Sequence, residues 1–193
     1  MHIRFFILVI LFLPSLAIAE MQSPDDVAYQ FYTWLLSEAG AGSGLPTTKD
    51  KEQLAQFFSP GLLKLLDAAV VMEQRCIENN PAGDKPYTVE GNIFVGNYEG
   101  ASEVVVGQLR QEGKNIIVAS RLLSIDSRFP KAHKYRVHTW TDQLVLSSDK
   151  TRWLISNIKF ESGTSLWRLL EEYIKESELS CKPTHASLNS GAQ

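Results

Sequence analysis

The residue pattern of the chain changes near Tyr87, and this change limits the folds that the chain can adopt. Before Tyr87, apolar residues recur at helical spacing, whereas after it short runs rich in β-branched and aromatic residues alternate with turn residues. A block of helices followed by a block of strands is typical of an α+β domain. We therefore expect an α+β fold in which helices pack on one face of a curved antiparallel sheet.

Three helices are expected before Tyr87, and a fourth follows the last strand. Serine–proline pairs begin the first and third helices, because serine caps a helix and proline fits its first position. The expected helices are 23–39, 49–58, 59–78 and 165–176. Turn residues separate five expected strands, which are 92–95, 102–109, 115–123, 135–146 and 152–160.

The first residues have the pattern of a secretory signal peptide. Arg4 supplies positive charge, and residues 5–13 form an apolar run that is short for a membrane span. The small residues at 17–19 predict cleavage before Glu20, with an uncleaved N-terminal anchor as the alternative. We therefore expect residues 1–19 to be removed and the protein to reside in the periplasm or outside the cell.

The remaining chain of about 170 residues suits one well-buried core. We expect residues 20–181 to form a single domain, and the small, polar residues 182–193 to be disordered. No stable membrane insertion is expected after cleavage, since no later segment is long and apolar enough. The net charge is −3 and no basic stripe is evident, so no nucleic-acid partner is expected. His133, beside Lys131 and Lys134, has the pattern of a solvated charge cluster.

Cys76 and Cys181 are the only cysteines of the sequence. Both lie in the part of the chain expected to be exported, where the compartment favours oxidation. We predict a disulfide that closes a loop of about 100 residues, worth about 4 to 5 kcal/mol in the chain-entropy model. The alternative is a buried Cys76 and a free thiol at Cys181. Two distant cysteines and four scattered histidines give no ligand spacing, so no metal site is expected.

Two short motifs carry a family resemblance. The Phe31-Tyr32-x-Trp34-Leu35 core of the first helix and the strand Arg152-Trp153-Leu154-Ile155-Ser156-Asn157-Ile158 resemble the nuclear transport factor 2-like superfamily, in particular a mostly secreted bacterial branch of the type called domain of unknown function 3828. The resemblance covers residues 24–175 and implies a cone-like curved sheet around a long helix, with a pocket between them. It implies no particular reaction, since isomerases, dehydratases, transport adaptors and toxin-neutralising proteins share this fold. A homodimer through the exposed sheet face is compatible with it.

Glu73 falls in the middle of the apolar face of the expected third helix. A carboxylate aimed at a core must find hydrogen-bond donors or take up a proton, because burying it bare is too costly. Glu73 is therefore a candidate for the polar floor of a pocket. The alternative is a structural role, in which its side chain bonds to a neighbouring backbone group or reaches solvent.

A second candidate set alternates onto one face of the expected strand 135–146. These residues are Arg136, His138, Trp140 and Asp142. The opposite face, with its valines and threonines, is the expected packed side, so a solvent-facing row with ordinary cross-strand pairs is the simple interpretation. Under the functional interpretation, this row would line one pocket with Glu73 and Tyr32. An acid and a histidine there would support proton transfer.

The sequence contains no nucleophile motif and no cofactor loop, so no cofactor is expected. The leading hypothesis is a non-enzymatic periplasmic module that binds a protein partner or a small ligand through the open end of the cone. A toxin-neutralising protein and an envelope accessory protein are two versions of it. The alternative hypothesis is a small-molecule isomerase or lyase that uses Glu73 and His138.

Overall fold

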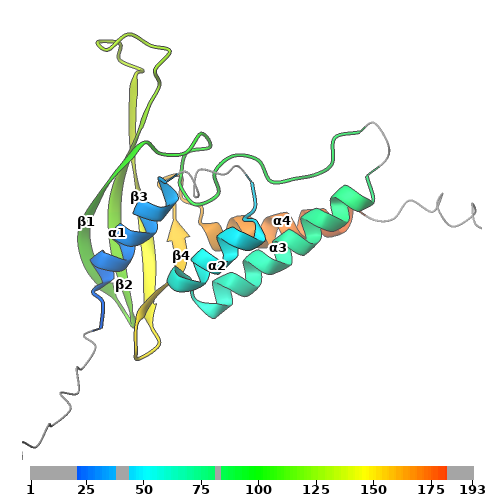
Figure 1. Cartoon of the computed structure of the whole chain (residues 1–193), viewed down its shortest axis with the longest axis horizontal. Coiled ribbons are helices and arrows are strands. Elements are labelled where there is room, and N and C mark those ends of the chain that lie inside the picture. Colours follow the sequence, from blue (N-terminus) through cyan, green and yellow to red (C-terminus); the bar gives the residue numbers. More distant parts are fainter. Residues whose placement is uncertain (1–20, 38–43, 81–83, 182–193) are drawn as a thin grey trace, which may run out of the picture.

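The computed structural model describes residues 21–37, 44–80 and 84–181 (Figure 1). In this part of the chain, three helices precede four strands, and a fourth helix follows. The elements are α1 (Pro24–Leu35), α2 (Thr48–Phe57), α3 (Pro60–Glu78), β1 (Glu103–Glu112), β2 (Asn115–Ile125), β3 (Val137–Ser148), β4 (Trp153–Lys159) and α4 (Leu166–Ser180). The protein therefore has the predicted α+β fold with a C-terminal helix.

The described strands form an antiparallel meander in the order β1-β2-β3-β4. Gly113, with a φ of 63°, lies in the tight turn that joins β1 to β2, where glycine adopts the left-handed conformation at no steric cost. The pairing register shifts between Val106 and Leu109 in β1 and between Val145 and Leu146 in β3. Such bulges bend and twist the strands, and they contribute to the curvature of the sheet.

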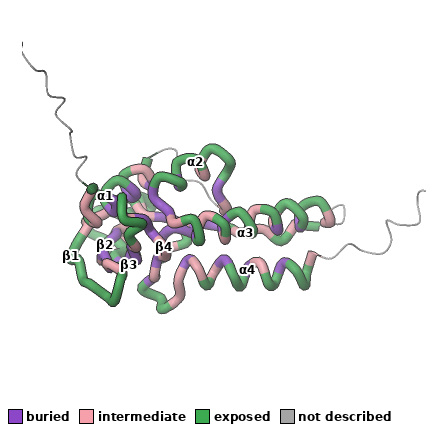
Figure 2. Tube along the Cα trace, turned by 90° about the horizontal axis from the view of Figure 1, so that it is seen from below, coloured by how far each residue is buried: buried purple, intermediate pink, exposed green. Residues whose placement is uncertain are grey.

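The helices take two different positions relative to the sheet. α1 lies across one face of the sheet, whereas α3 and α4 run side by side and extend beyond it (Figures 1 and 2). Both serine–proline starts are confirmed, because the Ser23 and Ser59 hydroxyls accept hydrogen bonds from the first turns of α1 and α3. The ends differ slightly from the prediction, since α1 ends at Leu35 and α4 continues to Ser180.

An aromatic cluster joins α1 to the end of α2 and to the loop 92–95. The fully buried Phe31 ring lies 5.4 Å from the ring of Phe58 and 5.9 Å from that of Phe57. Phe94 lies 6.4 Å from Phe31 in an edge-to-face arrangement. Tilted and edge-to-face contacts of this kind stabilise a core beyond the area that they bury. Aromatic side chains therefore make up much of this part of the core.

Residues 92–95 do not form the predicted strand. They follow a series of bends, with one isolated bridge between Asn92 and Gly44. The Asn92 side chain instead accepts a hydrogen bond from the Phe94 backbone N–H at 2.9 Å. Ile93, Phe94 and Val95 are all buried. Their apolar run therefore reflects the packing of a loop against the core rather than strand pairing.

The predicted disulfide between Cys76 and Cys181 is present, and it joins the far ends of α3 and α4. The two Cα atoms lie 4.8 Å apart across a sequence separation of 105 residues. The Asn79 side chain donates a further hydrogen bond to the Cys181 carbonyl oxygen at 3.2 Å. The helix pair is thus closed at the end that extends furthest from the sheet.

The expected signal peptide, residues 1–19, and the expected disordered tail, residues 182–193, lie outside the described residues. Within the described ranges, no helix has the length and apolar character needed to cross a membrane. The core there is a single cluster that includes residues from α1 through α4.

Candidate functional site

β3 turns Trp140 and Asp142 toward the core. Trp140 is 6% exposed and Asp142 is fully buried, whereas Val137, Thr139 and Thr141 on the opposite face are exposed. The prediction that the face with valines and threonines is the packed side was therefore wrong. The physical reason is that Trp140 Nε1 donates a hydrogen bond to Asp142, so both polar groups keep a partner when they are buried.

Asp142 accepts three hydrogen bonds in the core. Its Oδ2 accepts from the Gly96 backbone N–H at 2.7 Å and from Trp140 Nε1 at 3.0 Å, and its Oδ1 accepts from the Glu161 backbone N–H at 3.4 Å. A Cβ atom on Gly96 would lie 2.7 Å from Oδ1, so glycine is needed for this approach. Burial raises the pKa of Asp142 above its usual value, although the three donors oppose this shift. Asp142 thus ties β3 to two loops.

Tyr32 and Ser120 place two hydroxyl groups beside Asp142. Ser120 lies directly opposite Asp142 in the β2–β3 register, and both Tyr32 and Ser120 are fully buried. Neither hydroxyl makes a hydrogen bond of good geometry to a described residue. Burial, and next the charge of Asp142, raise the pKa of Tyr32, while the nearby Ser120 hydroxyl opposes the shift. Tyr32, Trp140 and Asp142 therefore lie in one cluster that is shielded from solvent.

Glu73 lies apart from that cluster, on α3. Its half-buried carboxylate accepts a hydrogen bond from the Val89 backbone N–H at 2.9 Å. Burial raises the pKa of Tyr173, and the charge of Glu73 adds to this shift. These contacts fit the structural alternative, in which Glu73 holds the segment around Val89 against α3.

Arg136 and His138 lie at the end of the β2–β3 hairpin. His138 is exposed, and its ring stacks on Trp140 at a centroid distance of 5.6 Å. The Arg136 guanidinium donates to the Phe129 carbonyl oxygen. Glu73, on α3, has the Val89 backbone as its partner, so its contacts are separate from those of His138.

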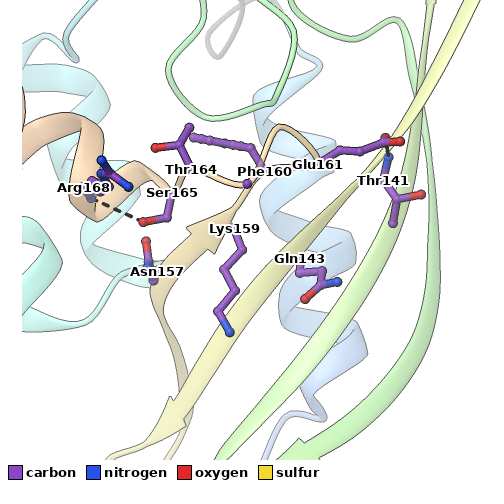
Figure 3. A pocket seen from close by; sticks show the side chains of 10 residues that line it. Thr141, Gln143, Asn157, Lys159, Phe160, Glu161, Thr164, Ser165 and Arg168 are labelled. Carbon is purple, nitrogen blue, oxygen red and sulfur yellow. Dashed lines mark hydrogen bonds between the residues drawn. The ribbon is translucent and has the colours of Figure 1, made fainter.

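An open groove lies on the opposite face of the sheet from α1, beside the start of α4 (Figure 3). Its volume is about 560 Å³, and it is lined by residues of β3, of β4 and of the segment that leads into α4. The lining residues are Thr141, Gln143, Asn157, Lys159, Phe160, Glu161, Gly163, Thr164, Ser165 and Arg168. Most of these side chains can donate or accept hydrogen bonds.

Local hydrogen bonds fix the wall of this groove. Gly163 adopts a φ of 89° in a tight turn, and its N–H donates to the Phe160 carbonyl oxygen at 3.0 Å. Ser165 caps α4 by accepting from the Arg168 backbone N–H at 3.3 Å. Asn157 Oδ1 accepts from the Trp167 backbone N–H at 3.0 Å, which ties the first turn of α4 to β4.

The two cationic side chains of the groove, Lys159 and Arg168, form ion pairs only with exposed carboxylates. Lys159 Nζ lies 3.5 Å from a carboxylate oxygen of Glu112 on β1, and Arg168 Nε lies 2.7 Å from one of Glu172. Exposed ion pairs of this kind contribute little to stability, because water and salt screen them. Both cations can therefore turn toward a bound ligand at little cost.

A second hollow of about 360 Å³ adjoins the first, because Thr164 borders both. Its lining residues are Tyr87, Thr88, Val89, Thr164, Leu169, Glu172, Tyr173 and Glu176. The rings of Tyr87 and Tyr173 stack at a centroid distance of 5.4 Å. The Tyr87 hydroxyl donates to Glu176 at 2.6 Å, and this hydrogen bond, with a smaller effect of burial, raises the pKa of Tyr87 to about 12. We call the two hollows together the α4 groove.

The six residues predicted to line a pocket do not line the α4 groove. Two of the six have an indirect role there, because Glu73 holds the backbone of Val89 and Asp142 holds that of Glu161. Within residues 21–37, 44–80 and 84–181, no three His, Cys, Asp or Glu side chains are grouped so that they could hold a metal ion.

Comparisons of the chain with protein-family models, curated proteins and solved structures found no match. The α4 groove and the buried Asp142 cluster are therefore interpreted from their geometry. Of these two, only the groove is open to a ligand.

Proposed function

We propose that the protein is a non-enzymatic binding module that holds an extended segment of a protein partner in the α4 groove. The observation that carries this proposal is the pair of open hollows that adjoin at Thr164. An elongated surface suits an extended chain, whose backbone offers donors and acceptors at every residue. Gln143, Asn157 and Thr164 supply partners of both kinds, and Tyr87 supplies apolar area.

The way in which α4 is anchored supports this proposal. Ser165 and Asn157 fix the first turn of α4, and the disulfide at Cys181 fixes the chain immediately after its end. A groove built on a helix that is fixed at both ends loses little conformational entropy when a ligand binds. Preorganisation of this kind raises affinity without additional contacts.

We further propose that the protein acts in the periplasm or outside the cell, as a toxin-neutralising protein or an envelope accessory protein. The Cys76–Cys181 disulfide supports an oxidising compartment. The order of helices and strands is compatible with the nuclear transport factor 2-like superfamily, and membership in it is part of this proposal.

Charge reversal in the groove tests the proposed function. The double variant Lys159→Glu/Arg168→Glu changes two lining residues, and the control Lys49→Glu/Lys64→Glu makes the same change of charge on the exposed surfaces of α2 and α3. Each tagged protein would be used to recover partners from a native envelope extract. We expect a defined partner with the wild type and the control, and its loss with the groove variant. Equal recovery by all three proteins, or no partner at all, would count against the proposal.

A further inference from the structure

The loop that joins β2 to β3, residues 126–136, forms a tip that stands away from the helices (Figure 1). We call it the hairpin tip. The Asp126 N–H donates to the Arg136 carbonyl oxygen at 2.8 Å, and the His133 N–H donates to that of Pro130 at 2.9 Å. The hairpin tip is therefore an ordered structure with its own hydrogen bonds.

Three rings pack together on the hairpin tip. The rings of Phe129 and His133 stack at a centroid distance of 4.5 Å, and Tyr135 lies 5.5 Å from His133. Tyr135 is nevertheless 63% exposed, and Val137, at the start of β3, is 51% exposed. The hairpin tip thus presents aromatic and aliphatic surface to its surroundings.

The same residues carry a concentrated positive charge in a chain whose net charge is −3. The basic residues of the tip are Arg128, Lys131, Lys134 and Arg136, and the acidic one is Asp126. Asp126 is already paired with Arg128 at 2.6 Å. Within the described ranges Lys131 and Lys134 make no ion pair, and Lys134 Nζ lies 4.6 Å above the Tyr135 ring.

We propose that the hairpin tip docks onto a lipid bilayer that contains anionic phospholipids. Lysine and tyrosine are suited to the headgroup region, because each has an apolar body and a polar end. Anionic headgroups complement Lys131 and Lys134, while Phe129 and Tyr135 supply the apolar contact. A small tip favours a bilayer over an acidic protein, since it reaches a flat surface unhindered but offers little area for a protein interface.

Vesicle sedimentation with the full chain tests this proposal. The variant Lys131→Ala/Lys134→Ala removes two lysine charges of the tip, and Lys49→Ala/Lys64→Ala is the control with the same net charge. The apolar run 5–13 is present in the wild type, the tip variant and the control, so it contributes equally to the vesicle binding of all three. On vesicles of phosphatidylcholine and phosphatidylglycerol, we expect binding to weaken by about fivefold for each tip lysine removed, and the control to bind like the wild type.

A second measurement locates the contact. We expect phosphatidylglycerol vesicles to slow hydrogen exchange at the hairpin tip, and vesicles of phosphatidylcholine alone to leave it unchanged. Equal binding by the tip variant and the control, or unchanged exchange at the tip, would overturn the proposal. Protection of the tip by soluble polyglutamate but not by vesicles would also overturn it, and would indicate an acidic protein instead.

Discussion

Cys76, in the last turns of α3, is bonded to Cys181, the residue that follows α4, although 105 positions separate them in the sequence. We expect Cys76→Ala/Cys181→Ala to lower the free energy of unfolding by about 4 kcal/mol, because the unfolded chain gains the freedom of a long open loop. Denaturant unfolding of the variant, and of the wild type with and without reductant, measures this loss. Equal midpoints for the oxidised wild type and the variant would contradict it.

Gly96 is expected to tolerate no side chain. In Gly96→Ala the new Cβ would lie 2.7 Å from Asp142 Oδ1, and we expect a loss of about 2 kcal/mol in unfolding free energy. Gly61→Ala, in α3, is the matched control, because its Cβ would lie 3.7 Å from the Trp167 ring of α4, an ordinary contact. Gly61→Ala should raise the unfolding free energy by up to about 1 kcal/mol, since alanine restricts the unfolded chain. Thermal unfolding compares the two, and a similar effect in both would refute the assigned role of Gly96.

Tyr32→Phe is expected to stabilise the protein. The Tyr32 hydroxyl is buried beside Asp142 without a well-formed hydrogen bond, so its removal should raise the unfolding free energy by about 1 kcal/mol. Tyr29→Phe, at a position that is 62% exposed, should change it little. Urea unfolding distinguishes the two variants. A clear loss of stability in Tyr32→Phe would mean that the hydroxyl has an essential partner.

The raised pKa of Asp142 gives a dependence of stability on pH. The folded state holds the carboxyl proton of Asp142 more tightly than the unfolded chain does. The stability that this proton adds is therefore fully present below the unfolded pKa of about 4. It is lost as the pH rises through the higher folded pKa. The unfolding free energy of the wild type should therefore fall relative to that of Asp142→Asn as the pH is raised above about 4. A difference between the two proteins that stays constant, or that shifts in favour of the wild type, would contradict this assignment.

Features encoded by neighbouring residues were predictable from the sequence. Ser23 and Ser59 identify two helix starts correctly, because capping involves only residues within one turn. The pairing of Cys76 with Cys181 was predictable from their number and the expected compartment.

Apart from the disulfide, the features that depend on distant partners were not predictable. The inward face of β3 was misassigned, because the burial of Asp142 depends on donors at Gly96 and Glu161, far from it in the sequence. The α4 groove was missed for a related reason, since its residues come from two strands, two loops and one helix and follow no local period.

Site-specific photo-crosslinking tests the proposed binding function most directly. A photoreactive amino acid at Thr164, which borders both hollows, would be compared with one at Lys49, an exposed residue of α2. Both proteins would be irradiated in the native cell envelope and resolved by mass. We predict one discrete crosslinked partner from position 164 and none from position 49. The absence of a product at position 164, or the same products from both positions, would contradict a binding role for the α4 groove.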